Sequence, residues 1–205
     1  MKPVVQRGFT TIEFLIAITI TSLIAVASTG LIMAIAQATD VEEDRRETVV
    51  RAQAVEARLS SYVTMSRYIL GADSTSVVIW LDDSRETGTV NLSEIRWIYR
   101  NTSENSVRVD FVVFPDEWTE LQRTAADIEL TVDSDWWTER RTAEAQGLIR
   151  TLRLSDRVSS LGVEHDSQTQ AGQRLVTFRV TFGGDTGDRT VVAASSIREL
   201  QEPDS

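Results

Sequence analysis

The sequence predicts an α+β protein in which a long amino-terminal helix packs on an antiparallel β-sheet domain, with the first half of that helix in a membrane. Three observations lead to this prediction. Residues 14–36 are uncharged and mostly apolar, residues 38–70 contain no proline or glycine and keep a helical apolar spacing, and strand-like segments follow from residue 76 onward. A helix followed by a run of strands is typical of the α+β class.

The uncharged run Phe14–Ala36 is long enough to cross a bilayer. Its 23 residues span roughly 34 Å as a helix, which exceeds a hydrocarbon core of about 30 Å. Lys2 and Arg7 precede the run, and four acidic residues follow it: Asp40, Glu42, Glu43 and Asp44. Because positively charged flanks stay on the cytoplasmic side, we expect a single pass with the amino terminus in the cytoplasm and the body of the protein outside.

Two ordinary explanations of this run are open. It fits a plain signal anchor that holds an external binding domain at the membrane without any assembly. It also fits a cleavable secretory signal, because Ala25-Val26-Ala27 has the pattern of a cleavage site, and cleavage after Ala27 would release a soluble protein. Neither explains Glu13, the only charged side chain between Phe9 and Gln37. A carboxylate at the middle of a membrane helix costs about 2.5–3.5 kcal/mol on insertion scales, so its presence indicates a function and a partner.

The residues around Glu13 form a short motif. Arg7-Gly8-Phe9-Thr10-Thr11-Ile12-Glu13 contains a basic leader that ends in glycine, then an aromatic residue, and a glutamate five residues after that glycine. This motif resembles the processing motif of the type IV prepilin family, in which the glutamate is the fifth residue of the mature chain. The resemblance implies that a prepilin peptidase cuts between Gly8 and Phe9 and methylates the new amine of Phe9. It also implies that Glu13 meets the positive amino terminus of a neighbouring subunit during assembly.

Electrostatics makes such a partner for Glu13 plausible. Two unit charges about 4 Å apart attract by about 4 kcal/mol at an effective dielectric constant of 20, which is comparable with the insertion cost of the carboxylate. The alternative is that Glu13, one helical turn after Phe9, simply reaches the cytoplasmic interface with its polar end.

Small residues recur along the predicted membrane helix. Ala17, Thr21 and Ala25 are spaced four apart, and so are Gly30 and Ala34. Small side chains at this spacing let apolar helices approach closely. Many pilins have a helix-loosening proline in this region; here the segment has none, and Gly30 lies near where that proline would fall. Glycine weakens a helix by about 1 kcal/mol.

The predicted layout of helix and sheet also resembles the pilin family. The domain is more strand-rich than the smallest members and lacks the cysteine pair that ties a carboxy-terminal loop in many of them, because the chain contains no cysteine. The resemblance therefore implies a minor pseudopilin or minor type IV pilin, which would sit in the bacterial inner membrane with its domain in the periplasm. Its expected partners are prepilin peptidase, other pilin or pseudopilin subunits and inner-membrane lipid.

The pattern divides the chain into a leader (residues 1–8), a membrane and assembly helix (9–37), its continuation (38–71) and a β-rich domain (72–205). The continuation has an apolar stripe, and Gly71 and Asp73 indicate where the helix ends. Its first charged residues, 40–47, indicate a solvated segment at the membrane–water interface. The stripe consists of Thr48, Ala52, Val55, Leu59, Tyr62, Ser66 and Ile69, widened by Val49, Val63 and Leu70.

The domain reads as strands with turn signals between them. We expect the clearest hairpin to join residues 175–182 and 189–197 through the loop 183–188, and a second hairpin to join 94–100 and 107–114 through 101–105. Further strands are expected at 76–81, 128–132, 148–154 and 159–165.

Composition excludes several functions for this domain. The formal net charge of −10 lacks the basic footprint of nucleic-acid binding, and the absence of cysteine excludes disulfides, thiolate catalysis and zinc–cysteine sites. We find no phosphate-binding loop or nucleophile elbow, so we expect neither enzymatic activity nor a cofactor. His165, in a polar stretch, is expected to be solvated.

One acidic motif keeps a second interpretation. Asp133 and Asp135 are weak candidates to hold calcium through their oxygens, but the rest of an EF-hand is missing, so we expect an ordinary polar loop and no metal site. The five tryptophans could form a binding surface or lie in the core and in half-buried strands; we expect the core. They are Trp80, Trp97, Trp118, Trp136 and Trp137.

Overall fold

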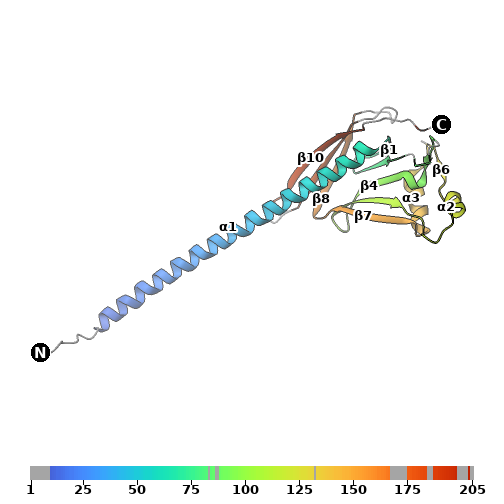
Figure 1. Cartoon of the computed structure of the whole chain (residues 1–205). Coiled ribbons are helices and arrows are strands. Elements are labelled where there is room, and N and C mark those ends of the chain that lie inside the picture. Colours follow the sequence, from blue (N-terminus) through green and yellow to red (C-terminus); the bar gives the residue numbers. More distant parts are fainter. Residues whose placement is uncertain are drawn as a thin grey trace, which may run out of the picture. The chain divides into compact units, whose positions relative to one another are not determined.

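A computed structural model describes residues 10–82, 84–85, 88–131, 133–166, 175–183, 187–197 and 203. The predicted leader with Gly8, the following Phe9, and residues 184–186 of the loop 183–188 lie outside the described residues. The chain forms two units, Met1–Arg46 and Glu47–Ser205. Among the described residues, the first unit contains Thr10 and helix α1 as far as Arg46, and the second contains the rest of α1 and the strands (Figure 1).

Helix α1 spans Thr11–Met65 and enters the second unit at Glu47. Within this unit one face of the helix is buried, at steps of four and three that follow the helical period: Thr48, Ala52, Val55, Leu59 and Val63. The stripe predicted from the sequence is thus confirmed in its central part.

The predicted helix end near Gly71 is wrong, because α1 stops at Met65. The backbone N–H and the hydroxyl of Ser66 both donate to the carbonyl of Val63, at 3.1 and 2.7 Å, which closes the last turn. Tyr68–Ala72 then forms strand β1. Ile69 faces one core and Leu70 the other, so apolar residues that also fit a helical stripe belong to a strand buried on both faces.

The larger sheet has five antiparallel strands in the order β1-β2-β4-β5-β7. After β1 they are β2 (Ser76–Trp80), β4 (Ile95–Asn101), β5 (Ser106–Val112) and β7 (Ile149–Ser155). A second sheet has the order β10-β9-β8, with β8 (Val158–His165), β9 (Leu175–Phe182) and β10 (Arg189–Ser196). Both predicted hairpins, β4–β5 and β9–β10, are confirmed.

Short elements cover the far side of the larger sheet. They are β3 (Val90–Asn91), the 3₁₀ turn η1 (Leu92–Glu94), α2 (Glu120–Ala126), β6 (Glu129–Leu130) and α3 (Trp136–Ala145). The strand predicted at 128–132 is reduced to β6, which pairs only with β3.

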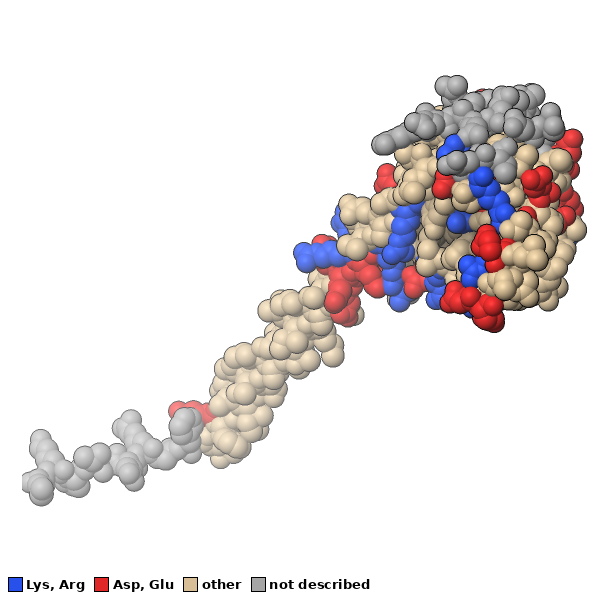
Figure 2. Space-filling model, turned by 45° about the vertical axis from the view of Figure 1, so that its right-hand side comes forward, with Lys and Arg blue, Asp and Glu red and all other residues tan. Residues whose placement is uncertain are grey.

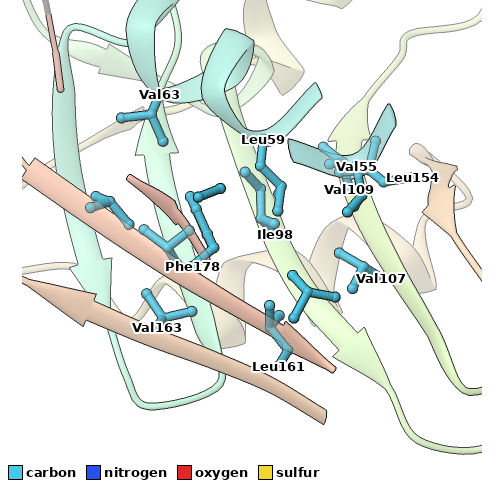
Figure 3. Packing of buried hydrophobic residues seen from close by; sticks show 14 of the residues in the cluster. Val55, Leu59, Val63, Ile98, Val107, Val109, Leu154, Leu161, Val163 and Phe178 are labelled. Atoms are coloured by element: carbon cyan, nitrogen blue, oxygen red, sulfur yellow. The ribbon is translucent and has the colours of Figure 1, made fainter. Parts of the chain in front are cut away.

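Two hydrophobic cores lie on opposite faces of the five-stranded sheet. The first is enclosed by α1 and both sheets: Val55, Leu59 and Val63 of the helix point toward Ile98, Val107 and Val109 on one side and Phe178 on the other (Figure 3). The second lies between the sheet and α3, around Trp80, Trp97 and Trp136. Side chains alternate between the cores along β2, where Val77 and Ile79 join the first and Val78 and Trp80 the second.

Polar bonds fix α1 on both sides of its buried face. The Nη1 of Arg58 donates to the carbonyl of Leu154 in β7 at 2.6 Å. On the other side the hydroxyls of Thr64 and Ser195 are 2.9 Å apart, and Ser195 also donates to the carbonyl of Ser60 at 3.2 Å. The helix is therefore held to one edge strand of each sheet, β7 and β10.

Replacing Leu59 by alanine tests the importance of this packing. Leu59 is completely buried, so Leu59→Ala should lower the free energy of unfolding of the domain by about 2–5 kcal/mol through lost contacts and a cavity. The measurement is urea denaturation in detergent, followed by tryptophan fluorescence. Val50→Ala, on the exposed face of the same helix, should change the value by less than about 0.5 kcal/mol; equal effects would contradict the packing described here.

Candidate functional site

The first part of α1 presents an apolar surface that the described chain does not cover. The most apolar stretch of α1 is not buried at all by the described residues. Examples of its exposed side chains are Ile12 (69%), Leu23 (66%) and Val26 (73%). Figure 2 shows this stretch free of charge up to a band of acidic and basic residues. By length and composition α1 is able to cross a membrane. An uncovered apolar surface of this extent requires lipid or other protein around it.

Three hydroxyl groups in this segment are hydrogen-bonded within the helix itself. The hydroxyls of Thr19, Thr21 and Thr29 donate to the carbonyls of Leu15, Ala17 and Ala25, four residues earlier, at 2.7–2.8 Å. A hydroxyl bonded to its own helix can lie in hydrocarbon without an unpaired donor. Glu13 differs from these groups because it is charged, so its place in the segment still needs an external explanation.

Glu13 lies in the first turn of α1 and forms a capping box with Thr10. Its Oε2 accepts from the backbone N–H of Thr10 at 2.9 Å and from the Thr10 hydroxyl at 3.0 Å, and the Glu13 N–H donates to Thr10 Oγ1 at 3.3 Å. The signal Thr-x-x-Glu was present in the sequence but was not interpreted as a cap. Both bonds to the carboxylate use Oε2, so among the described residues Oε1 has no partner.

The predicted packing residues lie on α1 in two rows. Ala17, Thr21 and Ala25 form one row, and Gly30 and Ala34 form another; all are exposed. At about 100° per residue, the step from Ala25 to Gly30 turns the helix by about 140°, which places the rows on different faces. A Cβ at Gly30 would meet nothing within 4 Å, so packing within this chain does not account for the glycine.

The acidic pair predicted as a weak calcium candidate has a structural use. Asp135 is the N-cap of α3, where Oδ1 accepts from the N–H groups of Trp137 and Thr138 and Oδ2 from the Thr138 hydroxyl at 2.6 Å. These bonds, first that of the Thr138 side chain, lower the pKa of Asp135. Asp133 is exposed in the preceding turn. Among the described residues no three acidic or histidine side chains are placed to hold a metal.

The remaining candidates belong to the fold. Trp80 and Trp97 are fully buried and Trp136 is 7% exposed, so their assignment to the core is confirmed. Trp136 and Trp137 begin helix α3, however, and do not lie in a strand. His165 ends strand β8, at the end of the predicted strand 159–165, and its side chain is exposed as expected.

Two buried acidic groups that the sequence analysis missed anchor the second core. Asp110 is fully buried and accepts from Tyr99 at 3.0 Å, from Thr151 at 2.6 Å and from Arg140 of α3 at 2.7 Å. Burial and the charge of Asp110 raise the pKa of Tyr99. Glu94 accepts from Trp80 Nε1 at 3.0 Å and from the N–H of Asn91 at 3.1 Å. Because each carboxylate is fully bonded within the chain, these sites are structural anchors.

No family model, no curated protein and no solved structure matches this chain. The site must therefore be judged on its own residues. Its components are Glu13, whose Oε1 has no partner among the described residues, at the start of an apolar helix that those residues leave uncovered, and two rows of small residues along that helix.

Substitution of Asp133 and of Asp135 should have different effects on stability. Asp135→Ala removes the cap of α3 and should lower the urea midpoint of the domain at pH 7, whereas Asp133→Ala should leave it unchanged with or without added calcium. The pKa of Asp135 is lower in the folded state than in the unfolded state. Its contribution to the stability of the domain is therefore fully present above the unfolded pKa of about 3.9 and is lost as the pH falls through the lower folded pKa. The difference in urea midpoint between the wild type and Asp135→Ala should therefore become smaller at acidic pH. A calcium-dependent midpoint that Asp133→Ala abolishes would contradict this assignment.

Proposed function

We propose that this protein is a minor pseudopilin or minor type IV pilin subunit, processed by a prepilin peptidase and added through its amino-terminal helix to a helical assembly of related subunits. Glu13 carries the proposal: it is a carboxylate five residues after Gly8, the expected cleavage position, at the start of an apolar helix that the described chain leaves uncovered. The subunit would occupy the bacterial inner membrane with its amino terminus in the cytoplasm and its domain in the periplasm.

The position of Glu13 supports a pairing with a neighbouring amine. Its Oε2 caps the helix at Thr10, the residue that would follow the processed Phe9. The other oxygen, Oε1, would accept the positive amine of an adjacent subunit without loss of the cap. Such an ion pair in the membrane offsets the cost of the charge, which neither a plain anchor nor a secretory signal does.

The two rows of small residues support an assembly in which each helix has more than one neighbour. A plain anchor needs only length and apolarity. Rows on faces separated by about 140° let helices approach from two directions, as a helical bundle of subunits requires.

Substitution of Glu13 by glutamine separates assembly from capping. Glutamine at this position retains the capping box but loses the charge, so Glu13→Gln should reduce incorporation into assemblies at least about tenfold, a change that corresponds to only ~1.4 kcal/mol. Incorporation is measured as the fraction of tagged chain that co-purifies with related subunits from the native membrane. Thr10→Ala is the matched control: it weakens the cap, keeps the charge and should assemble. If Glu13→Gln assembles normally and Thr10→Ala does not, Glu13 is a helix cap only.

A bulky residue in place of Gly30 tests the second row. Gly30→Ala adds a Cβ that meets nothing in the chain and should be tolerated, whereas Gly30→Leu should reduce incorporation by blocking close approach of a neighbour. Ser22→Leu, between the two rows, is the control and should assemble as the wild type does. Equal incorporation of Gly30→Leu and Ser22→Leu would show that this face meets only lipid.

A further inference from the structure

A groove with a positively charged lining runs along α1 beside the end of strand β7. It measures about 310 Å³, and its lining includes Val50, Arg51, Ala54 and Arg58 of the helix together with Arg153 and Asp156. Three arginines against one aspartate make this lining positive, although the formal charge of the whole chain is −10. All of these residues belong to the unit Glu47–Ser205, so the groove is formed within one compact unit.

Arg58 is the cation of the groove whose charge is not neutralised. Arg51 and Arg153 have carboxylate partners, which are Glu47 for the first and Glu104 for the second. Arg58 instead donates through its Nη1 to a backbone carbonyl of β7 at 2.6 Å, and within the described ranges no carboxylate pairs with it. The groove therefore favours a ligand that brings a carboxylate.

The segment around α2, residues 113–129, has the opposite charge and an uncovered apolar surface. None of the side chains of α2 is buried, and Leu121 is 81% exposed, the highest value for a large apolar side chain among the described residues. Four acidic residues of the segment are exposed and form no ion pair in the described part of the chain: Asp116, Glu117, Glu120 and Glu129. The one basic residue, Arg123, donates to two backbone carbonyls of the same segment.

The groove and α2 lie at opposite ends of the five-stranded sheet. Strand β5 leads into the α2 segment, and its last residue, Val112, pairs with Ile149 at the start of β7. The groove lies near Leu154 at the other end of β7, about five residues or roughly 17 Å further along the strand. In Figure 1 α2 lies on the side of the domain away from α1. The domain therefore cannot place its own α2 in its own groove.

We propose that the groove of one copy of this chain receives α2 of a second copy, with α2 antiparallel to α1. Leu121 and Ala125 are four residues apart on α2 and both are exposed. Val50 and Ala54 are four residues apart on α1 and line the groove. Residues at this spacing lie on one face of a helix. In an antiparallel arrangement a single placement therefore puts Leu121 on Ala54 and Ala125 on Val50.

The same placement brings the unpaired charges together. Glu120 lies at the start of α2, and Arg58 follows Ala54 by one turn of α1. With the helices antiparallel, both lie at the same end of the contact, so that the carboxylate and the guanidinium form an ion pair at its rim. The contact joins two different surfaces, so each added copy leaves one groove and one α2 free for the next. It goes beyond the proposed function, because neither surface includes Glu13 or the processing motif.

Cysteine cross-linking in the native membrane tests the contact, because the chain contains no cysteine of its own. One tagged full-length copy carries Ala125→Cys in α2, and a second, differently tagged copy carries Ala54→Cys in the groove. A short thiol cross-linker should join the two tags, whereas neither variant should cross-link to itself. Ala194→Cys, at an exposed alanine of β10, replaces Ala125→Cys as the control and should give no product.

Charge reversal then decides whether the groove recognises α2. Arg58→Glu in the copy with Ala54→Cys should reduce the cross-linked product at least tenfold, and Glu120→Arg in the other copy should restore it. The restored product also shows that Arg58→Glu has not unfolded the domain. Arg141→Glu, which reverses an exposed arginine of α3, should have no effect.

The outcomes distinguish this inference from the proposed function. A product that is absent, insensitive to Arg58→Glu, not restored by Glu120→Arg or equally strong with Ala194→Cys overturns the contact, even if assembly depends on Glu13. Cross-linking of Ala54→Cys to a different subunit in place of the second copy overturns it as well. If the product follows the charges at Arg58 and Glu120 while Glu13→Gln assembles normally, the contact stands and the proposed function fails.

Discussion

The burial of one helix face between two sheets is the interaction on which the domain depends. Val55, Leu59 and Val63 fill the space between the five-stranded and the three-stranded sheet, and the polar bonds of Arg58 and Ser195 hold the same turns to an edge strand of each. Because these residues continue the helix that begins at Thr11, the turns that carry the domain and the uncovered apolar turns belong to one element.

Along this single helix the distribution of apolar residues changes while the helical conformation continues. Before residue 40 apolar residues occur on every face of the helix and Glu13 is its one charged residue, which is suitable for lipid or for other helices. After residue 47 one apolar stripe is buried, which is suitable for a core. Charged residues lie between the two. In the proposed assembly Glu13 and the small residues would make the contacts within the membrane.

The sequence predicted the elements whose signals are local and failed where tertiary packing decides. The pattern of residues 175–182 and the stripe through Leu59 were sufficient to predict a strand and a helix face. Ile69 and Leu70 led to the wrong helix end. Apolar residues at these two positions fit a helical stripe, but they also fit a strand such as β1 that is buried on both faces. Helices α2 and α3 were missed although Thr119 and Asp135 give ordinary cap signals. Asp110 could not be identified as an anchor, since its partners Tyr99, Arg140 and Thr151 come together only in the fold. For the candidate site, the sequence identified Glu13 but not its cap with Thr10.

The most direct test of the central claim is the mass of the amino-terminal peptide of the protein purified from its native membrane. Processing as a prepilin-like subunit predicts a peptide that begins at Phe9 and carries one N-methyl group. A peptide that begins at Ser28, or one that retains Met1, would contradict the account and leave a secreted or simply anchored domain.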